Sequence, residues 1–207
     1  MFKKSEIYDF ISIKIDYHCF SIANLMEITF TLCQGDEELN QILGLQGRNL
    51  RNTQSAEVEA DQGFVTVQHD LKLLKSMNEA AKHIIAKDGE RVVGYALAMT
   101  KDFQDEIPVL KSMFDLIDSL LVNGVPLGEG TYIVMGQVCV DYDYRGKGIF
   151  QGLYNKYFEV YKPNYQHIIT EIAARNTRSL RAHLNVGFKE IHRYIEPGVE
   201  EWIVVMY

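Results

Sequence analysis

Apolar and polar residues alternate over residues 28–32, ITFTL, which predicts a half-buried strand. Asp36 follows as a candidate N-cap, and apolar residues recur behind it at helical spacing, so a helix should begin there. Residues 46–62 are polar with weak periodicity and are expected to form a loop with helical turns. The alternation at the start of the chain is lost after Ile15, and residues 1–25 are interpreted as an N-terminal extension.

The clearest short-range signal in the middle of the chain is a β-hairpin. Two apolar runs, residues 83–87 and 91–100, flank Asp88-Gly89, a dipeptide typical of tight hairpin turns. A later amphipathic stretch carries Pro108 near its start, where proline suits the first turn of a helix. The other elements predicted here are a short strand at 63–68, a helix at 70–80, the amphipathic helix at 106–121 and a turn-rich segment at 123–130.

The last third of the chain alternates between strands and helices. The predicted elements are a nearly continuous apolar strand at 131–140, a helix from Phe150 that stops before Pro163, a strand at 167–174, a helix at 177–186 closed by Gly187, and strands at 188–195 and 200–207. This order predicts an α/β or α+β fold, with a mixed, mostly antiparallel central sheet flanked by helices and containing one parallel crossover. We expect a single domain over residues 26–207.

Composition narrows the class of protein. A formal net charge of -7 excludes the strongly basic face that nucleic acid binding requires. Cys19, Cys33 and Cys139 are odd in number and widely spaced, which favours reduced thiols, or simply small core residues, in a cytoplasmic protein. No apolar stretch reaches the roughly 18 residues of a membrane span, and charged residues interrupt the segment after Lys3-Lys4 that a signal peptide would need.

The first candidate for a functional site is Arg145-Gly146-Lys147-Gly148, where a strand should become a helix. The first N–H groups of a helix have no internal acceptor and lie at the positive end of its dipole, so they attract anions. Glycines let the main chain approach a phosphate closely, and the two cations add charge. A tight turn with solvated cations is the alternative. The G-x-x-x-x-G-K-[ST] motif and the third glycine of the dinucleotide fingerprint are both absent, which argues against a nucleotide triphosphatase or a Rossmann dehydrogenase.

Two segments together resemble the motifs of one superfamily. QVCVDYDYRGKGIF, residues 137–150, is similar to motif A of the GNAT superfamily of acyl-CoA-dependent N-acyltransferases, and NTRSLRAHLNVGF, residues 176–188, is similar to its N-x-x-(A/S)…G-F motif. The resemblance covers residues 82–207 well and residues 26–81 more loosely. It implies a GNAT-like fold, with a helical insertion around 103–130, and an N-acetyltransferase that uses acetyl-CoA as co-substrate.

The same resemblance assigns the residues that bind acetyl-CoA. Val138, Cys139 and Val140 would pair with the pantetheine arm, and Arg145, Gly146, Lys147, Gly148 and Ile149 would hold the pyrophosphate. Asn176 would hydrogen-bond the pantetheine. Phe150 occupies the last position of the family turn, which is small in the family pattern.

Three further residues are candidates for acting on the amine and the leaving thiol. His183 occupies the position where many family members place a Tyr that acts as the general acid. His183 could itself serve as general acid, or it could be a wall residue that only lines the site. Glu171, near the end of its strand, could be the general base or could pair with Arg175 or Arg178. Gln137 could orient the acceptor or be a satisfied buried amide.

The resemblance leaves several properties open. The acceptor would be a primary amine of a small molecule or a protein, and the alternatives are a non-catalytic CoA-binding sensor and a transferase for a longer acyl-CoA. The apolar stripe of the 103–130 segment could pack as core, form a homodimer surface, or act as a lid. No histidine cluster has metal-ligand spacing, so we expect no metal, and we expect neither a nucleic acid nor a membrane partner.

Overall fold

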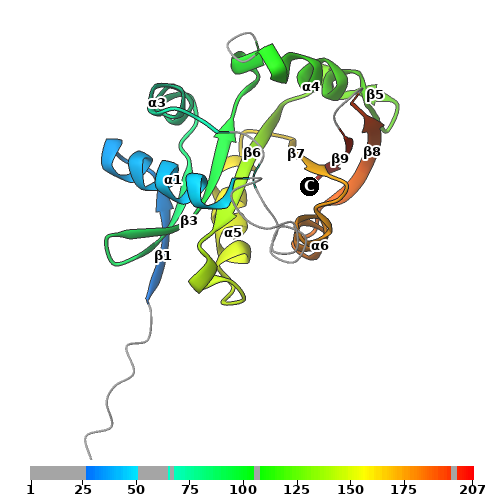
Figure 1. Cartoon of the computed structure of the whole chain (residues 1–207). Helices are drawn as coiled ribbons and strands as arrows, with labels where there is room; N and C mark the ends of the chain where they lie inside the picture. The colour runs from blue at the N-terminus through cyan, green and yellow to red at the C-terminus, as the bar shows by residue number, and fades with distance from the viewer. Residues whose placement is uncertain (1–26, 51–64, 66–67, 105–107, 197–199) are drawn as a thin grey trace, which may run out of the picture.

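The computed structural model describes residues 27–50, 65, 68–104, 108–196 and 200–207. Short 3₁₀ turns lie at Lys101–Gln104, Leu127–Glu129 and Tyr142–Tyr144. The helices and strands of Figure 1 are, in chain order, β1 Ile28–Leu32, α1 Asp36–Asn49, α3 Leu71–Ala80, β2 Ile84–Asp88, β3 Arg91–Met99, α4 Pro108–Ser119, β4 Leu121–Val122, β5 Val125–Pro126, β6 Tyr132–Val140, α5 Ile149–Tyr161, β7 His167–Ala173, α6 Thr177–Asn185, β8 Lys189–Ile195 and β9 Glu201–Met206.

A seven-stranded sheet organises the described residues, in the order β1-β2-β3-β6-β7-β9-β8. Neighbouring strands are antiparallel except β6 and β7, which are parallel and joined through α5. The predicted mixed, mostly antiparallel sheet flanked by helices, with one parallel crossover, is therefore confirmed.

Helices cover both faces of this sheet. The first face packs on α5, through residues such as Ile149, Leu153 and Tyr157, and α6 adds Leu180 beside them. The opposite face, called here the α1 face, is covered by α1, α3 and α4, with Tyr95 and Phe114 fully buried. Because both faces are covered, β3 is buried from its second residue to its last. Figure 1 shows α1 crossing the strands on the side opposite α5.

The hairpin and most predicted elements are confirmed, with small shifts at their ends. The two-residue hairpin loop is Gly89-Glu90, because Asp88 pairs with Arg91, and Gly89 has a positive φ of 57°. Asp70 caps α3 as its N-cap, with its side chain accepting from the N–H of Leu73. The prediction for Asp36 was wrong in detail: Gly35 is the N-cap of α1, and Asp36 is its first helical residue.

The expected loop at 46–62 was wrong for residues 46–49, which belong to α1. Gln46 and Asn49 are polar but buried, so the inward face of this last helical turn does not look hydrophobic in the sequence. Residues 51–62, the extension at 1–25 and Cys19 lie outside the described residues. Of the strand expected at 63–68, Val65 forms an isolated parallel bridge with Leu50.

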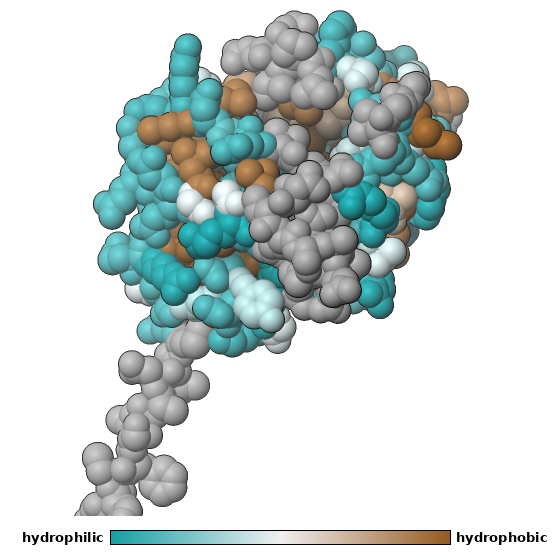
Figure 2. Space-filling model, in the orientation of Figure 1, coloured by the Kyte–Doolittle hydropathy of each residue, from teal (hydrophilic) through white to brown (hydrophobic). Residues whose placement is uncertain are grey.

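The 103–130 segment contains a shorter helix than predicted. α4 ends at Ser119, and Leu121 leaves the helix for β4, where it is exposed. The inward stripe of α4, including Phe114 and Ile117, packs as core on the α1 face. Figure 2 shows the β4–β5 hairpin as an apolar patch at the upper right, and its exposed apolar residues are Leu121 and Val125. Among the described residues no helix combines the length and apolar character of a membrane span.

Candidate active site

The parallel strands β6 and β7 separate partway along their length. Their pairing runs from Tyr132↔His167 to Val134↔Ile169, while β6 continues to Val140 with β3 on its other side. The register with β3 shifts at this point, because Ala98 pairs with Met135 but Leu97 pairs with Gln137. Gly136 is thus a bulge residue, and it is the exposed position of an otherwise buried or half-buried strand. Beyond Val134↔Ile169, no strand of the described residues pairs with β6 on its β7 side, where the Val140 carbonyl accepts from the Arg145 side chain.

The glycine turn after β6 forms a helix N-terminus without a side-chain cap. Gly146 and Gly148 have φ values of 74° and 79°, the left-handed region that other residues rarely adopt. Gly148 is the N-cap of α5, and the first backbone bond of the helix runs from the N–H of Gly152 to the carbonyl of Gly148. The N–H groups of Ile149, Phe150 and Gln151 therefore have no acceptor within the helix and point out of its end.

A cavity of about 370 Å³ joins this helix end to the edge of β6. It is bounded on its other sides by the end of α1 and by α6. Its lining residues are Asn49, Val65, Val138, Cys139, Val140, Tyr144, Arg145, Gly146, Gly148, Ile149, Phe150, Gln151, Arg178, Ser179, Ala182, Asn185 and Val186. The structure thus brings together seven of the residues expected to bind acetyl-CoA, whereas Lys147 and Asn176 do not line the cavity.

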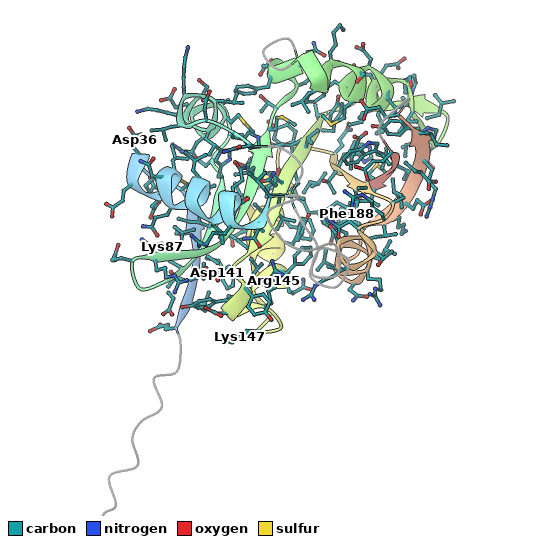
Figure 3. The ribbon with its side chains drawn as sticks, viewed as in Figure 1. Asp36, Lys87, Asp141, Arg145, Lys147 and Phe188 are labelled. Carbon is teal, nitrogen blue, oxygen red and sulfur yellow. The ribbon has the colours of Figure 1, made fainter. Side chains whose placement is uncertain are left out.

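Arg145 is held in place beside this cavity. Its Nε donates to the carbonyl of Val140 at 3.1 Å and its Nη2 to Oδ1 of Asn49 at 2.7 Å. Buried Asp141 accepts from both Arg48 and Arg91, at 3.2 and 2.8 Å, so its negative charge is compensated next to the turn. Figure 3 shows Asp141 and Arg145 together near the end of α1, with Lys147 further out on the turn. A fixed positive charge therefore borders the helix N-terminus, as an anion site needs.

Two positions of the sequence motifs have definite structural partners. Asn176 is the N-cap of α6, where its Oδ1 accepts from the N–H of Ser179 at 3.2 Å. Phe150 lines the cavity, and its ring packs on that of Tyr154 with ring centres 5.0 Å apart. Gly148 and Ile149, at the N–H end of α5, line the same cavity as Phe150.

His183 is enclosed in an aromatic cluster. Its ring centre lies 5.2 Å from that of Phe150, 5.3 Å from that of Tyr154 and 5.5 Å from that of Phe188. Only 1% of its surface is exposed, and burial lowers the pKa of its imidazole to about 4. Nδ1 lies 2.7 Å from the carbonyl of Ser179, which fixes the neutral ring's proton on Nδ1. Nε2, which has no hydrogen-bond partner among the described residues, then carries a lone pair. This geometry favours the wall alternative over the general acid.

Gln137 belongs to a buried polar network. Its Oε1 accepts from Nε2 of Gln46 at 2.8 Å and from the hydroxyl of Tyr95 at 2.6 Å. Gln46 also accepts from the N–H of His69, so the network links α1, β3, β6 and the start of α3. The bulge at Gly136 turns Gln137 onto the α1 face, and Gln137 does not line the cavity. Of the two roles expected for Gln137, these contacts favour the buried, hydrogen-bonded amide over a residue that orients the acceptor.

Glu171 lies on β7 beyond the last residue paired with β6. Its Oε2 accepts from the hydroxyl of Tyr194 at 3.0 Å, while its Oε1 is buried with no hydrogen-bond partner among the described residues. Burial is the main cause that raises the pKa of this carboxyl to about 7; nearby Glu196 adds to it and the Tyr194 bond opposes it. The alternative role, an ion pair with Arg175 or Arg178, is not found among the described residues, and Arg175 instead bonds to Glu200 at 2.8 Å. A carboxyl group that titrates near neutral pH suits a general base.

Several site residues could not be found from the sequence. Asn49 and Arg178 reach the cavity from helices far apart in the chain, and Tyr194 meets Glu171 only through the order of strands β7-β9-β8. The one available signal was the helical period of α6, which places Arg178 and Ala182 on the same side as each other. Among the described residues no group of three His, Cys, Asp or Glu side chains could hold a metal ion.

Comparison with known proteins gives one family and one fold. The model of the "Acetyltransferase (GNAT) family" matches residues 47–188, more than half of the chain. No curated protein sequence matches.

Solved structures resemble the chain at low sequence identity. The ribosomal-protein-S18-alanine N-acetyltransferase of Escherichia coli has a TM-score of 0.56 and 14% identity, over 86% of this chain and 92% of that one. A chain of the NatC complex bound to Gag peptide and CoA has a TM-score of 0.59 and 14% identity, over 87% and 98%. A putative acetyltransferase, yncA from Salmonella typhimurium with its cofactor acetyl-CoA, has a TM-score of 0.57 and 14% identity, over 87% and 92%. At these identities the likeness shows the fold alone.

Proposed function

This chain belongs to the GNAT acetyltransferase family, and on that premise we propose that it transfers an acetyl group from acetyl-CoA to a primary amine of a small molecule or protein. The observation that carries the proposal is the cavity that joins the N-terminus of α5 to the edge of β6 on which no described strand pairs. An elongated ligand with a diphosphate at one end and a peptide-like arm at the other matches both parts.

The chemistry of the lining fits acetyl-CoA. The N–H groups at the start of α5, with Gly146 and Gly148 beside them, would hold the pyrophosphate, and Arg145 would compensate its charge. The edge of β6 at Val138–Val140 would pair with the amides of the pantetheine arm, as an added strand does. Arg178 and Ser179 close the opposite wall. When bound, acetyl-CoA supplies the acyl thioester.

Glu171 is the residue proposed to act on the amine. Its carboxylate would take the proton that the amine nitrogen loses as the new C–N bond forms and the C–S bond breaks, and water would protonate the departing thiolate. The gap between β6 and β7 lies beside Glu171, since strand pairing ends at Ile169. This arrangement would let an amine approach from the α1 face. Two of the similar structures are an S18-alanine N-acetyltransferase and a complex bound to a peptide, so a protein amine is a candidate acceptor as well as a small one.

The proposal is tested by two separate measurements on the full chain. We expect acetyl-CoA and CoA to bind in calorimetry at one site per chain. We also expect at least one member of a panel of small amines and peptides to accelerate thiol release from acetyl-CoA above the rate without acceptor. Binding of neither coenzyme would contradict the cofactor site, whereas binding without release for any acceptor would contradict the transferase.

A CoA-binding sensor is the second candidate, and the enclosure of His183 favours it. A neutral imidazole whose proton is bonded to the carbonyl of Ser179 cannot protonate a thiolate through Nε2. The sensor would bind acetyl-CoA and CoA without turnover. Use of a longer acyl-CoA has no comparable support, because the described part of the 103–130 segment contributes no residue to the cavity lining.

For His183 we expect the substitution His183→Phe to change thiol release by less than the roughly 100-fold that loss of a general acid causes. Phenylalanine keeps an aromatic ring within the cluster but has no nitrogen. Steady-state rates at saturating acetyl-CoA, with thermal unfolding as the control for packing, would measure this. A 100-fold loss in a variant that remains folded would restore the acid role.

A further inference from the structure

The two oxygens of the Glu171 carboxyl group have different surroundings. Its Oε2 accepts a hydrogen bond from the hydroxyl of Tyr194 at 3.0 Å, while its Oε1 is buried and has no partner among the described residues. A buried carboxylate without donors is unfavourable, so the single bond from Tyr194 is significant for its charged form.

The strand register explains how Tyr194 reaches Glu171. Glu171 pairs with Val204, and Val204 pairs with His192; two residues along, Trp202 pairs with both Ala173 and Tyr194. Paired residues and residues two apart share one face of a sheet, so Glu171, Tyr194 and Trp202 all lie on the α1 face. Tyr194 is a diagonal neighbour of Glu171 across β9. The indole Nε1 of Trp202 is a second buried polar atom on this face without a partner among the described residues.

We propose that Tyr194 is a positioning residue for Glu171: its hydroxyl fixes Oε2 and leaves Oε1 as the atom that receives the proton of the acceptor amine. This inference rests on the proposed function, because it gives Glu171 the role of base. It assigns to β8, a strand at the edge of the sheet, a part in the reaction that neither the family match nor the fold indicates.

Few other charged groups face this carboxyl. Glu196, the residue after β8, opposes its ionisation, and the ring of His192 stacks on that of Tyr194 with centres 6.3 Å apart. His167 lies two positions before Ile169, and four before Glu171, on the same face of β7. On β6, Tyr132 is bonded to Asp118 of α4 at 2.8 Å. Trp202 is the neighbour on β9, and it has no charge. Among the described residues, the hydrogen bond from Tyr194 is thus the favourable interaction that the charged form of Glu171 receives.

The substitution Tyr194→Phe tests the proposal, because it removes the hydroxyl and keeps the ring. Loss of a donor to the carboxylate raises the pKa of Glu171, so the acidic limb of kcat/KM should move to higher pH by about one unit. The rate should fall about tenfold at pH 6 and return to the parental value near pH 9. CoA affinity should be unchanged. A uniform loss at all pH values, with the limb in place, would show a merely structural role and overturn the proposal.

Tyr132→Phe is the matched control. It removes a tyrosine–carboxylate hydrogen bond of similar length on the same sheet face, from Tyr132 to Asp118, and it should not move the pH profile. A second test is the double variant: in a Glu171→Gln background, Tyr194→Phe should have little further effect on the rate. An undiminished effect there would contradict the pairing.

A readout without activity separates this inference from the proposed function. The ¹³C shift of the Glu171 carboxyl, followed against pH, should titrate at higher pH in Tyr194→Phe than in the parent. An equal titration would overturn the role of Tyr194 even in an active enzyme. A shifted titration in a chain that transfers no acyl group would support the Tyr194–Glu171 pair and reject the transferase.

Discussion

Gly148→Val should lower the affinity for CoA by about 10- to 100-fold. Gly148 has a φ of 79°, which valine adopts only with strain, so the N-cap backbone should leave the conformation that directs the N–H groups of α5 into the cavity. Each hydrogen bond to a charged group contributes about 1.5–3 kcal/mol, and about 1.4 kcal/mol corresponds to tenfold in affinity, so one misplaced donor gives this range. Calorimetry with CoA measures it directly.

Gly124→Val separates loss of the anion site from simple backbone strain. Gly124 lies in the β4–β5 turn with a φ of 83°, and, as at Gly148, an added Cβ would meet no atom within 4 Å. Both variants should therefore lose similar stability in thermal unfolding. Gly124 does not line the cavity, so its variant should bind CoA like the parent. Equal affinities for CoA in the parent and in folded Gly148→Val would reject the helix N-terminus as the pyrophosphate site.

The cavity could be predicted largely from the sequence because its main part is local. The end of β6, the two glycines and the start of α5 are consecutive, and their conformation depends on strand and helix signals within about fifteen residues. The left-handed φ of Gly146 and Gly148 is a property of glycine itself. The residues that close the cavity are different: Asn49 and Arg178 arrive through packing of α1 and α6, which no local pattern encodes.

Register and buried polar contacts account for what the sequence did not predict. A bulge at Gly136 decides that Gln137 faces Gln46 and Tyr95, and a shift of one residue would turn it to the other face. Tyr194 becomes a neighbour of Glu171 only because β9 lies between β7 and β8. His183 was chosen for its place in a motif, but its enclosure depends largely on Phe150 and Tyr154 of α5, which lie outside that motif.

Glu171→Gln should lower turnover by about 100-fold or more while CoA affinity stays at the parental value. The amide keeps the shape of the side chain but cannot accept the amine proton. Thiol release at saturating acetyl-CoA gives the turnover, and calorimetry gives the affinity. Glu200→Gln is a suitable control, because it also neutralises a carboxylate at this end of the sheet but breaks a pair with Arg175, and it should leave turnover near the parental value. Equal turnover in Glu171→Gln and the parent would exclude Glu171 as the base.

Glu171 should affect activity and stability in opposite directions as the pH rises. In the parent, kcat/KM should rise as pH increases through about 7, where the Glu171 carboxyl loses its proton. The free energy of unfolding should change in the opposite direction. The pKa of the Glu171 carboxyl is about 7 in the folded state and about 4.5 in the unfolded state, so its contribution to stability falls as pH rises between those values. Glu171→Gln removes this penalty, and its melting temperature at pH 8 should therefore equal or exceed that of the parent. A variant that is more stable yet far slower fits a base kept in an unfavourable buried site for its reactivity, whereas a variant that is slower because it unfolds does not.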